Sequence, residues 1–326
     1  MKKLLLASTA LVATAGVAAA DVSIIGTAEL GVFQNENGSG DGSTGDLSKT
    51  RVFSDIDVTF AMTGETDGGL AFGATIDLDE AFDDGFNDGD VNDPARQPDS
   101  SIFLSFGQMR LTVGDTDSAF DARLTEVAVG GAINDDHTVH PGYNGNSALD
   151  EAYGGQEIRF DYTFDAFTGS ISVSPDRNAT DFDTAFALGV SYNAELAGLD
   201  LGLGLGYIQV DEAAAAYDSI IGLSVGTTFG NGLSATVNFS NWSDDTSGGL
   251  DDATHYAIGF GYTMNALTLG LNYGEYDLDG GDASGYGFTA NYDLGGGMEA
   301  QLGYGGGDPV VGDYEDTFSL GVSMSF

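Results

Sequence analysis

The feature that most constrains the fold is a repeated alternation of apolar and small polar residues, in segments of about eight to twelve residues. The C-terminal segment shows it most clearly, since the apolar side chains from Phe318 to Phe326 alternate with Thr, Ser and Gly. Successive side chains of a β-strand point to opposite faces, so each segment has one apolar and one small polar face. The pattern predicts an all-β chain.

Sixteen such segments follow one another from residue 21 to residue 326, and the spacers between them are alternately long and short. In an antiparallel barrel, odd connections lie at one rim and even connections at the other. Barrels of bacterial outer membranes have short periplasmic turns and long external loops. The sequence therefore predicts a transmembrane, 16-stranded antiparallel β-barrel. The predicted strands are 21–34, 50–63, 69–82, 100–106, 108–114, 156–164, 168–174, 185–194, 199–210, 217–229, 233–242, 254–264, 267–276, 285–292, 298–304 and 317–326.

The small polar face of nearly every segment favours a membrane barrel over a soluble one. A soluble barrel fills its interior with apolar side chains, whereas a ring of sixteen strands is too wide to be filled and encloses water. Placing the apolar face outward against lipid and the polar face inward satisfies both solvents, and closure leaves no unpaired backbone edge in lipid. We therefore expect a water-filled channel.

Residues 1–20 have the composition of a cleaved signal peptide. Lys2 and Lys3 precede an apolar stretch, and Ala18 to Ala20 supply a small-residue cleavage site. A retained membrane anchor is the alternative, but the apolar run is short for one. We expect export, cleavage after residue 20, and a single barrel domain over 21–326.

Charge excludes one class of partner. Lys and Arg together number 9 against 51 acidic residues, which gives a formal net charge of −42. No basic patch can form on such a chain, so nucleic-acid binding is not expected. No Ser/His/Asp arrangement has a recognisable frame, and the chain is not expected to be an enzyme.

Two acidic segments invite a metal-site interpretation. His137 and His140 lie close to Asp135 and Asp136, but nothing fixes their spacing, and solvated loop histidines are the preferred interpretation. The run 83–93 resembles a calcium loop in composition only, because apolar residues occupy positions that need oxygen ligands. We expect no specific metal site and no cofactor, while loose binding of Ca²⁺ or Mg²⁺ by the acidic loops stays open because so negative a surface needs counter-ions.

Four blocks of the sequence resemble the general-diffusion porins of alphaproteobacteria. The resemblance covers residues 21–326 and is weakest in the long spacers. The blocks are Ile24-Ile25-Gly26-Thr27-Ala28-Glu29-Leu30-Gly31-Val32; Ser48-Lys49-Thr50-Arg51-Val52 with Thr63-Gly64-Glu65-Thr66-Asp67-Gly68-Gly69-Leu70-Ala71-Phe72-Gly73-Ala74; Ile102-Phe103-Leu104-Ser105-Phe106-Gly107 with Leu111-Thr112-Val113-Gly114-Asp115; and Tyr292-Asp293-Leu294-Gly295-Gly296-Gly297.

The resemblance implies a homotrimer in the Gram-negative outer membrane, whose partners are membrane lipid, lipopolysaccharide and the barrel-assembly machinery. It implies that the third long loop, about 115–155, folds inward and narrows the pore. It also implies that a terminal aromatic residue, here Phe326, is part of the assembly signal. Loop acids would then face wall bases across the constriction.

The residues that match this constriction are few on the basic side. No Lys or Arg follows Arg177, whereas walls of the family usually carry a denser arginine cluster. For Arg110 and Arg159 the alternative is that they merely neutralise Asp161 or a loop acid. The loop acids are Asp115, Asp117, Asp121 and Glu126, with Asp135 and Asp136 as further candidates, and the wall bases are Lys49, Arg51, Arg110 and Arg159.

The expected function is passive diffusion of small hydrophilic solutes through a pore that prefers cations. The preference follows from the loop acids and from acids on the polar face of the first strands, namely Glu29, Asp55, Asp57, Asp77 and Asp79. A non-conducting, adhesin-type surface barrel is the alternative from another class. A sugar-specific channel ranks lower, because Phe53 and Phe103 are among the few aromatic residues on the polar face.

Overall fold

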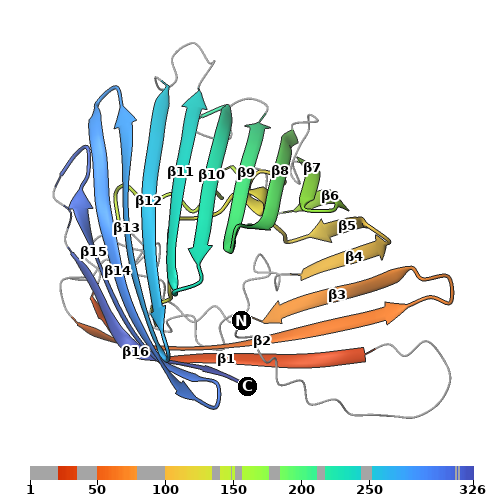
Figure 1. Cartoon of the computed structure of the whole chain (residues 1–326), viewed down its shortest axis with the longest axis horizontal. Coiled ribbons are helices and arrows are strands. Elements are labelled where there is room, and N and C mark those ends of the chain that lie inside the picture. Colours follow the sequence, from red (N-terminus) through yellow and green to blue (C-terminus); the bar gives the residue numbers. More distant parts are fainter. Residues whose placement is uncertain are drawn as a thin grey trace, which may run out of the picture.

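The computed structural model describes residues 21–34, 50–78, 100–133, 140–147, 149–150, 156–175, 184–210, 217–243, 252–312, 314 and 316–326. Within these ranges sixteen antiparallel strands form one closed barrel (Figure 1). Each strand pairs with its neighbours in sequence, and β1 pairs with β16 to close the ring. The predicted fold class is confirmed. The strands are β1 (Asp21–Gln34), β2 (Arg51–Glu65), β3 (Ala71–Leu78), β4 (Ser100–Phe106), β5 (Met109–Gly114), β6 (Glu157–Phe164), β7 (Phe167–Pro175), β8 (Thr184–Leu196), β9 (Leu199–Val210), β10 (Ser219–Phe229), β11 (Leu233–Ser243), β12 (Ala253–Met264), β13 (Leu267–Leu278), β14 (Gly281–Gly295), β15 (Met298–Asp308) and β16 (Thr317–Ser325).

The two faces of the wall differ as the alternation predicts. On β12 the side chains of Tyr256 and Ile258 are 42% and 37% exposed, whereas Ala257 between them is 5% exposed. An outward apolar face of this kind gains about 25 cal/mol for each Å² removed from water. The outward apolar face of the wall is therefore suited to contact with lipid.

One rim of the barrel is made of tight turns. Phe164 of β6 pairs with Phe167 of β7, which leaves a two-residue turn that begins at Asp165 with a φ of 54°. Positive φ at the first turn residue gives a hairpin whose twist matches that of the strands, and Asp tolerates it. The short connections predicted at this rim are consistent with this geometry.

The spacer predicted at 277–284 is wrong. β13 continues to Leu278 and β14 begins at Gly281, so that only Asp279 and Gly280 connect the two strands. The prediction rested on the loss of apolar alternation, but strand pairing uses backbone groups and continues beyond the apolar band. β15 likewise continues to Asp308, four residues past the predicted end, because its backbone remains paired beyond the apolar band.

Helical structure is minimal among the described residues. The helical element is η1, a single turn of 3-10 helix over Asp121–Arg123. No helix in the described part of the chain is long and apolar enough to cross a membrane. The proposed signal peptide, residues 1–20, lies outside the described residues and stays a prediction.

Candidate functional site

The segment that follows β5 lies against the polar face of the barrel wall. In Figure 1 it is the yellow trace that leaves β5, passes through η1 and runs along the inner side of the strands towards β13. We call its described residues, within 115–150, the docked loop. It is the longest of the predicted spacers.

Hydrogen bonds join the docked loop to successive strands of the wall. Its backbone N–H groups donate to serine hydroxyls and its carbonyls accept from wall amides and hydroxyls, so the extended backbone of the loop has polar partners. The bonds are Ala119 N to Ser172 Oγ at 2.8 Å, Thr125 N to Ser224 Oγ at 2.9 Å, Asn238 Nδ2 to Thr125 O at 3.1 Å, Thr289 Oγ1 to Val129 O at 2.6 Å, and Asn291 Nδ2 to Gly131 O at 2.7 Å.

Glycines of the wall make room for the loop backbone. A β-carbon built on Gly259 would lie 1.9 Å from the carbonyl oxygen of Val127, and one built on Gly270 would lie 1.9 Å from that of Val129. Real β-carbons do not approach backbone oxygen so closely, so these positions require glycine while the loop is docked. The composition of the sequence indicates a smooth inner wall, but it does not show that the loop occupies the space.

A small apolar cluster inside the ring holds the beginning of the loop. Phe120 is 1% exposed, and it packs with Ile208 and Ile220, which face inward from the ends of β9 and β10. A β-carbon on Gly206 would lie 2.7 Å from the Phe120 ring. Ile208 and Ile220 therefore pack against the docked loop inside the barrel.

His140 is a buried anchor of the loop, and the expectation of a solvated histidine is wrong. Its Nδ1 accepts from the N–H of Gly142 at 3.2 Å, so its Nε2 carries the proton and donates to Asn272 Oδ1 at 2.7 Å. His255 of β12 donates from Nε2 to the carbonyl of Gly142 at 2.9 Å. Burial lowers the pKa of His140 to about 4, because the charged form would be desolvated.

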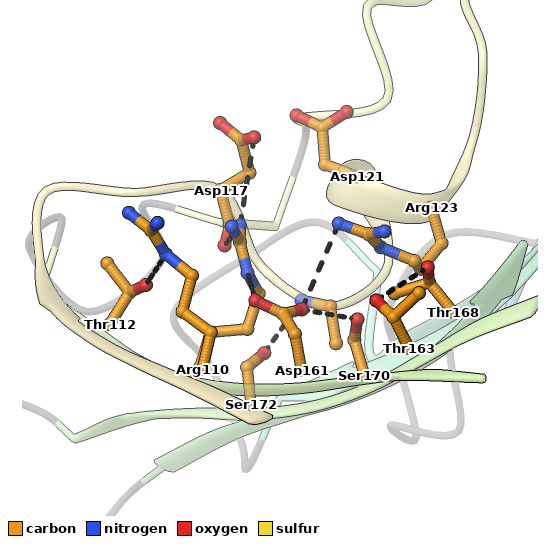
Figure 2. A network of polar contacts seen from close by, with 12 residues as sticks. Arg110, Thr112, Asp117, Asp121, Arg123, Asp161, Thr163, Thr168, Ser170 and Ser172 are labelled. Atoms are coloured by element: carbon orange, nitrogen blue, oxygen red, sulfur yellow. Dashed lines mark hydrogen bonds and ion pairs between the residues drawn. The ribbon is translucent and has the colours of Figure 1, made fainter. Parts of the chain in front are cut away.

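A cluster of charged side chains lies where the loop leaves β5 (Figure 2). Its centre is Asp161 of β6, which is 8% exposed. One carboxylate oxygen of Asp161 is 3.2 Å from Arg159 Nε, and the other accepts from Ser170 Oγ at 2.5 Å and lies 3.8 Å from Arg123 Nη2. Buried charges are tolerated when they are paired and hydrogen-bonded in this way.

The docked loop contributes both signs of charge to this cluster. Asp117 contacts the guanidinium of Arg159, through its carbonyl at 2.6 Å and its carboxylate at 3.8 Å. The Asp117 side chain is 63% exposed, so this pair is screened and weak. Arg123 was absent from the sequence-based site, although it lies two residues after Asp121 on the loop.

The other predicted loop acids have separate environments. Asp121 lies in η1, where neighbouring acids are close enough to affect its protonation. Glu126 accepts a hydrogen bond from Tyr143 of the same loop. Asp115 is exposed at the end of β5, and its N–H donates to the carbonyl of Ser100 at 2.9 Å.

Burial controls the protonation of two of the loop carboxyls. It raises the pKa of Asp121 to about 8, with further repulsion from Asp150, Asp117 and Glu126. It also raises the pKa of Asp150 to about 6, although the Ser118 N–H donates to that carboxylate at 2.9 Å. Burial lowers the pKa of Arg123, and Asp161 opposes the effect. Asp121 is therefore largely protonated at neutral pH.

The predicted wall bases do not form one group. Arg159 lies in the charged cluster, and Arg110 stands beside it on β5. Arg51 of β2 has its guanidinium 4.6 Å from the centre of the Phe33 ring. Lys49 lies outside the described residues. So do Asp79, Asp135, Asp136, His137, Arg177 and the run 83–93.

The first strands bring acids together on the polar face. Glu29 of β1 lies opposite Asp55 of β2, Thr27 Oγ1 donates to Asp57 at 2.8 Å, and Thr59 Oγ1 donates to Asp77 at 2.9 Å. A row of carboxylates on one side of a ring gives that side a negative potential. Among the described residues, no group of three or more His, Asp or Glu is arranged to hold a metal ion.

Comparisons with known proteins agree with this architecture. A family model described as Gram-negative porin matches residues 7–308. A double mutant of the Rh. blastica porin has 18% identity and a TM-score of 0.69, with 94% of this chain and 100% of that chain covered. A porin structure refined at 1.8 Å resolution has 20% identity and a TM-score of 0.67, with the same coverage. No curated protein matches the chain.

Proposed function

The chain belongs to the Gram-negative porin family, and from this premise we propose that it forms a cation-preferring pore constricted by the docked loop. Porins of this family and fold are channels for passive diffusion, and this chain is an integral β-barrel of the outer membrane. The proposal concerns the charge preference, the constriction and the assembly. Its solutes are small and hydrophilic, and they include ions.

The observation that carries the proposal is the placement of charge around the docked loop. Asp161 and Asp117 together balance the charges of Arg159 and Arg123, whereas the carboxylates of Asp55, Asp57 and Asp77 lie on the polar face of β2 and β3. A low-dielectric wall focuses such a potential into the water-filled space and concentrates cations there. Acids beyond a Debye length of ~8 Å at physiological salt contribute little.

The direct contact between Asp117 and Arg159 modifies what the family resemblance implies. The resemblance implies loop acids that face wall bases across an opening, but these two groups are 3.8 Å apart. Their fields largely cancel at a distance. We therefore assign the preference for cations mainly to the acids of β1 to β3, with the loop acids Asp121 and Glu126 as a weaker second source.

Reversal potential in a potassium chloride gradient tests the preference. The purified barrel in a planar bilayer is expected to give a cation-selective sign. Asp55→Asn with Asp57→Asn should reduce the potential more than Asp117→Asn with Asp121→Asn, because Asp121 is largely protonated. An anion-selective wild type would refute the proposed preference. A barrel that inserts without conducting would instead favour the alternative, an adhesin-type surface protein.

We propose a homotrimer as the assembled form, on the resemblance to trimeric porins. Light scattering in mild detergent measures it directly, together with a band on gels that shifts on heating. A species that remains monomeric in mild detergent would contradict the proposal. Lipopolysaccharide and the barrel-assembly machinery are the partners expected on the same basis.

Phe326 is proposed as part of the assembly signal. Its N–H donates to the carbonyl of Gly26 at 2.9 Å, while its side chain is 74% exposed on the outer face. So exposed a ring contributes little to the fold itself. Phe326→Ala is expected to lower the amount inserted in cells while the purified protein still refolds in detergent. Insertion at the wild-type level would contradict this role.

A further inference from the structure

A groove crosses the outer, apolar face of the barrel from β6 to β10 (Figure 1). Its volume is about 550 Å³, within the range of roughly 300 to 1,000 Å³ that is usual for small-molecule sites. The strand pairing places its outward-facing residues in two adjacent rows. One row is Tyr162, Gly169, Val190 and Leu205, and the other is Phe160, Ile171, Leu188, Tyr207 and Ile221.

Gly169 of β7 leaves a gap in the first row. It stands opposite Tyr162 of β6 and Val190 of β8, and a β-carbon built on it would meet no atom within 4 Å. Its φ is not positive, so the strand geometry does not require glycine here. At Gly259 and Gly270, by contrast, the docked loop fills the space beside the glycine. Glycine weakens a strand and often marks a place where a ligand approaches closely.

The lining of the groove is suited to an amphiphile. No described residue that lines it is charged, although the chain carries 51 acidic residues. Tyr207 donates from its hydroxyl to Gln209 Oε1 at 3.0 Å, and Gln209 is exposed on the same outward face. The Gln209 amide also has N–H groups that can donate to an ester or hydroxyl oxygen. The groove therefore combines an apolar length with an uncharged polar end.

The position of the groove identifies the kind of molecule that reaches it. The chain is an integral β-barrel of the outer membrane, so lipid surrounds its outward apolar face. Gln209 lies near the end of β9 that leads into the long spacer 211–216, which is the external end of such a strand. The strands of these barrels are tilted by about 35 to 45°, so a groove across them is inclined to the membrane normal. A flexible hydrocarbon chain can follow such a path.

We propose that this groove binds one acyl chain of an outer-leaflet lipid, and that the polar group at the head of this chain lies near Tyr207 and Gln209. The site depends on the location of the barrel in the membrane. It does not depend on the charge preference or on the constriction of the pore. It makes Gly169 a specificity-determining position on the outer face.

Native mass spectrometry of the barrel with phosphatidylethanolamine tests the proposal. The wild type should retain one lipid for each barrel. In Gly169→Leu the apparent affinity should fall about tenfold, because the new side chain takes apolar contact area away from the bound chain. The space around Gly169 is open, so the variant should fold. Its single-channel conductance should equal that of the wild type, because the substitution lies outside the lumen.

Ala290→Leu is the matched control. Ala290 faces outward on β14, opposite Leu269 and Leu302 and away from the groove, so this substitution also adds apolar bulk to the outer face. Its affinity for the lipid should stay at the wild-type value. An equal fall in both variants, or no fall in Gly169→Leu, would overturn the inference.

Competition on the wild type tests the role of the acyl chain without any substitution. Lysophosphatidylethanolamine, which keeps one chain, should displace the bound lipid, whereas glycerophosphoethanolamine, which has none, should not. Displacement by the second compound would overturn the inference, because the head group would then carry the affinity. Loss of the oligomer in Gly169→Leu with unchanged lipid retention would also overturn it and would assign the groove to a contact between copies of the chain. A wild type that binds the lipid without conducting would contradict the proposed function and support this inference.

Discussion

The inner wall of this barrel has two regions of opposite character. Where loop residues after Ser118 form hydrogen bonds with the wall, from β7 to β14, the contacting wall residues are neutral, as at Ser172 and Thr289, and glycines such as Gly259 lie beside the loop. On β1 to β6 the polar face instead carries charged residues, including Asp57 and Arg159. Neutral hydrogen-bonding groups give up water at little cost when a backbone covers them, whereas charged groups need water or a partner.

The difference indicates that the lumen is divided into a docking surface and a conducting surface. The docking surface fixes the position of the loop through glycines and backbone hydrogen bonds. The conducting surface carries charged side chains that are paired, as at Arg159 and Asp161, or only partly buried, as at Asp57. Pore width and charge preference should therefore respond to different substitutions.

The largest expected effect comes from filling the docking surface. Gly259→Ala with Gly270→Ala places methyl groups against the carbonyls of Val127 and Val129, so the loop must move away from the wall. Single-channel conductance in a planar bilayer should change by about a factor of two, since overpacking against backbone is not relieved by side-chain rotation. The sign of the reversal potential should stay the same.

Gly226→Ala supplies the control for this substitution. Gly226 is a glycine of β10 whose added β-carbon would have its nearest neighbour at 3.5 Å, an ordinary contact. Its conductance should equal that of the wild type. Equal changes in both proteins would mean that the loop is not positioned by close approach to glycine.

A smaller effect is expected from acid. The pKa of His140 in the docked loop is about 4, below its ordinary value of 6.5, because the ring is buried. The undocked loop therefore binds a proton at His140 more readily. The contribution of His140 to docking is complete above pH 6.5 and is lost as the pH falls from 6.5 towards 4. Conductance should become noisier or larger in this range, measured as a pH series.

His140→Gln is the variant that isolates this effect. A glutamine amide retains a donor for Asn272 but has no proton to gain, so the acid response should shrink. The titratable neighbours are His255 on β12 and, through Tyr143, the loop acid Glu126. An acid response of undiminished size in His140→Gln would assign it to these neighbours.

The smallest effect concerns the charge of the loop. Because burial and neighbouring acids raise the pKa of Asp121 to about 8, this carboxyl gains its charge only as the pH rises through that value. Cation selectivity should therefore increase slightly between pH 7 and 9. The same raised pKa means that the contribution of Asp121 to docking is lost as the pH rises from 3.8 to 8. Asp121→Asn should remove the increase in reversal potential. An identical pH profile in this variant would show that Asp121 does not face the permeating ions.

Local pattern was sufficient to predict the barrel. Alternation along each strand assigns its faces, and the lengths of the spacers assign the rims, since both depend on neighbouring residues only. The same reasoning failed at 277–284, where acidic residues continue a strand beyond the apolar band. The alternation from Phe318 to Phe326 was sufficient by itself to predict a strand there.

The candidate site was only partly predictable, because its contacts join residues that are far apart in the chain. The family resemblance places Asp117 and Arg159 at one constriction and leaves open whether Arg159 neutralises Asp161. The structure shows that Asp161 pairs with Arg159, and that no carboxylate among the described residues forms an ion pair with Arg110. It shows glycines at Gly259 and Gly270 without showing what passes over them.

By itself, then, the sequence determined the strands, their two faces and the negative charge of this protein. The course of the docked loop, the burial of His140 and the sharing of Asp161 were decided only by tertiary structure. They depend on contacts between residues far apart in the chain, such as Val129 with Thr289 and His140 with Asn272. The residues next to a polar side chain in the sequence do not specify its hydrogen-bond partner. Nor do the residues next to a glycine specify which segment fills the space beside it.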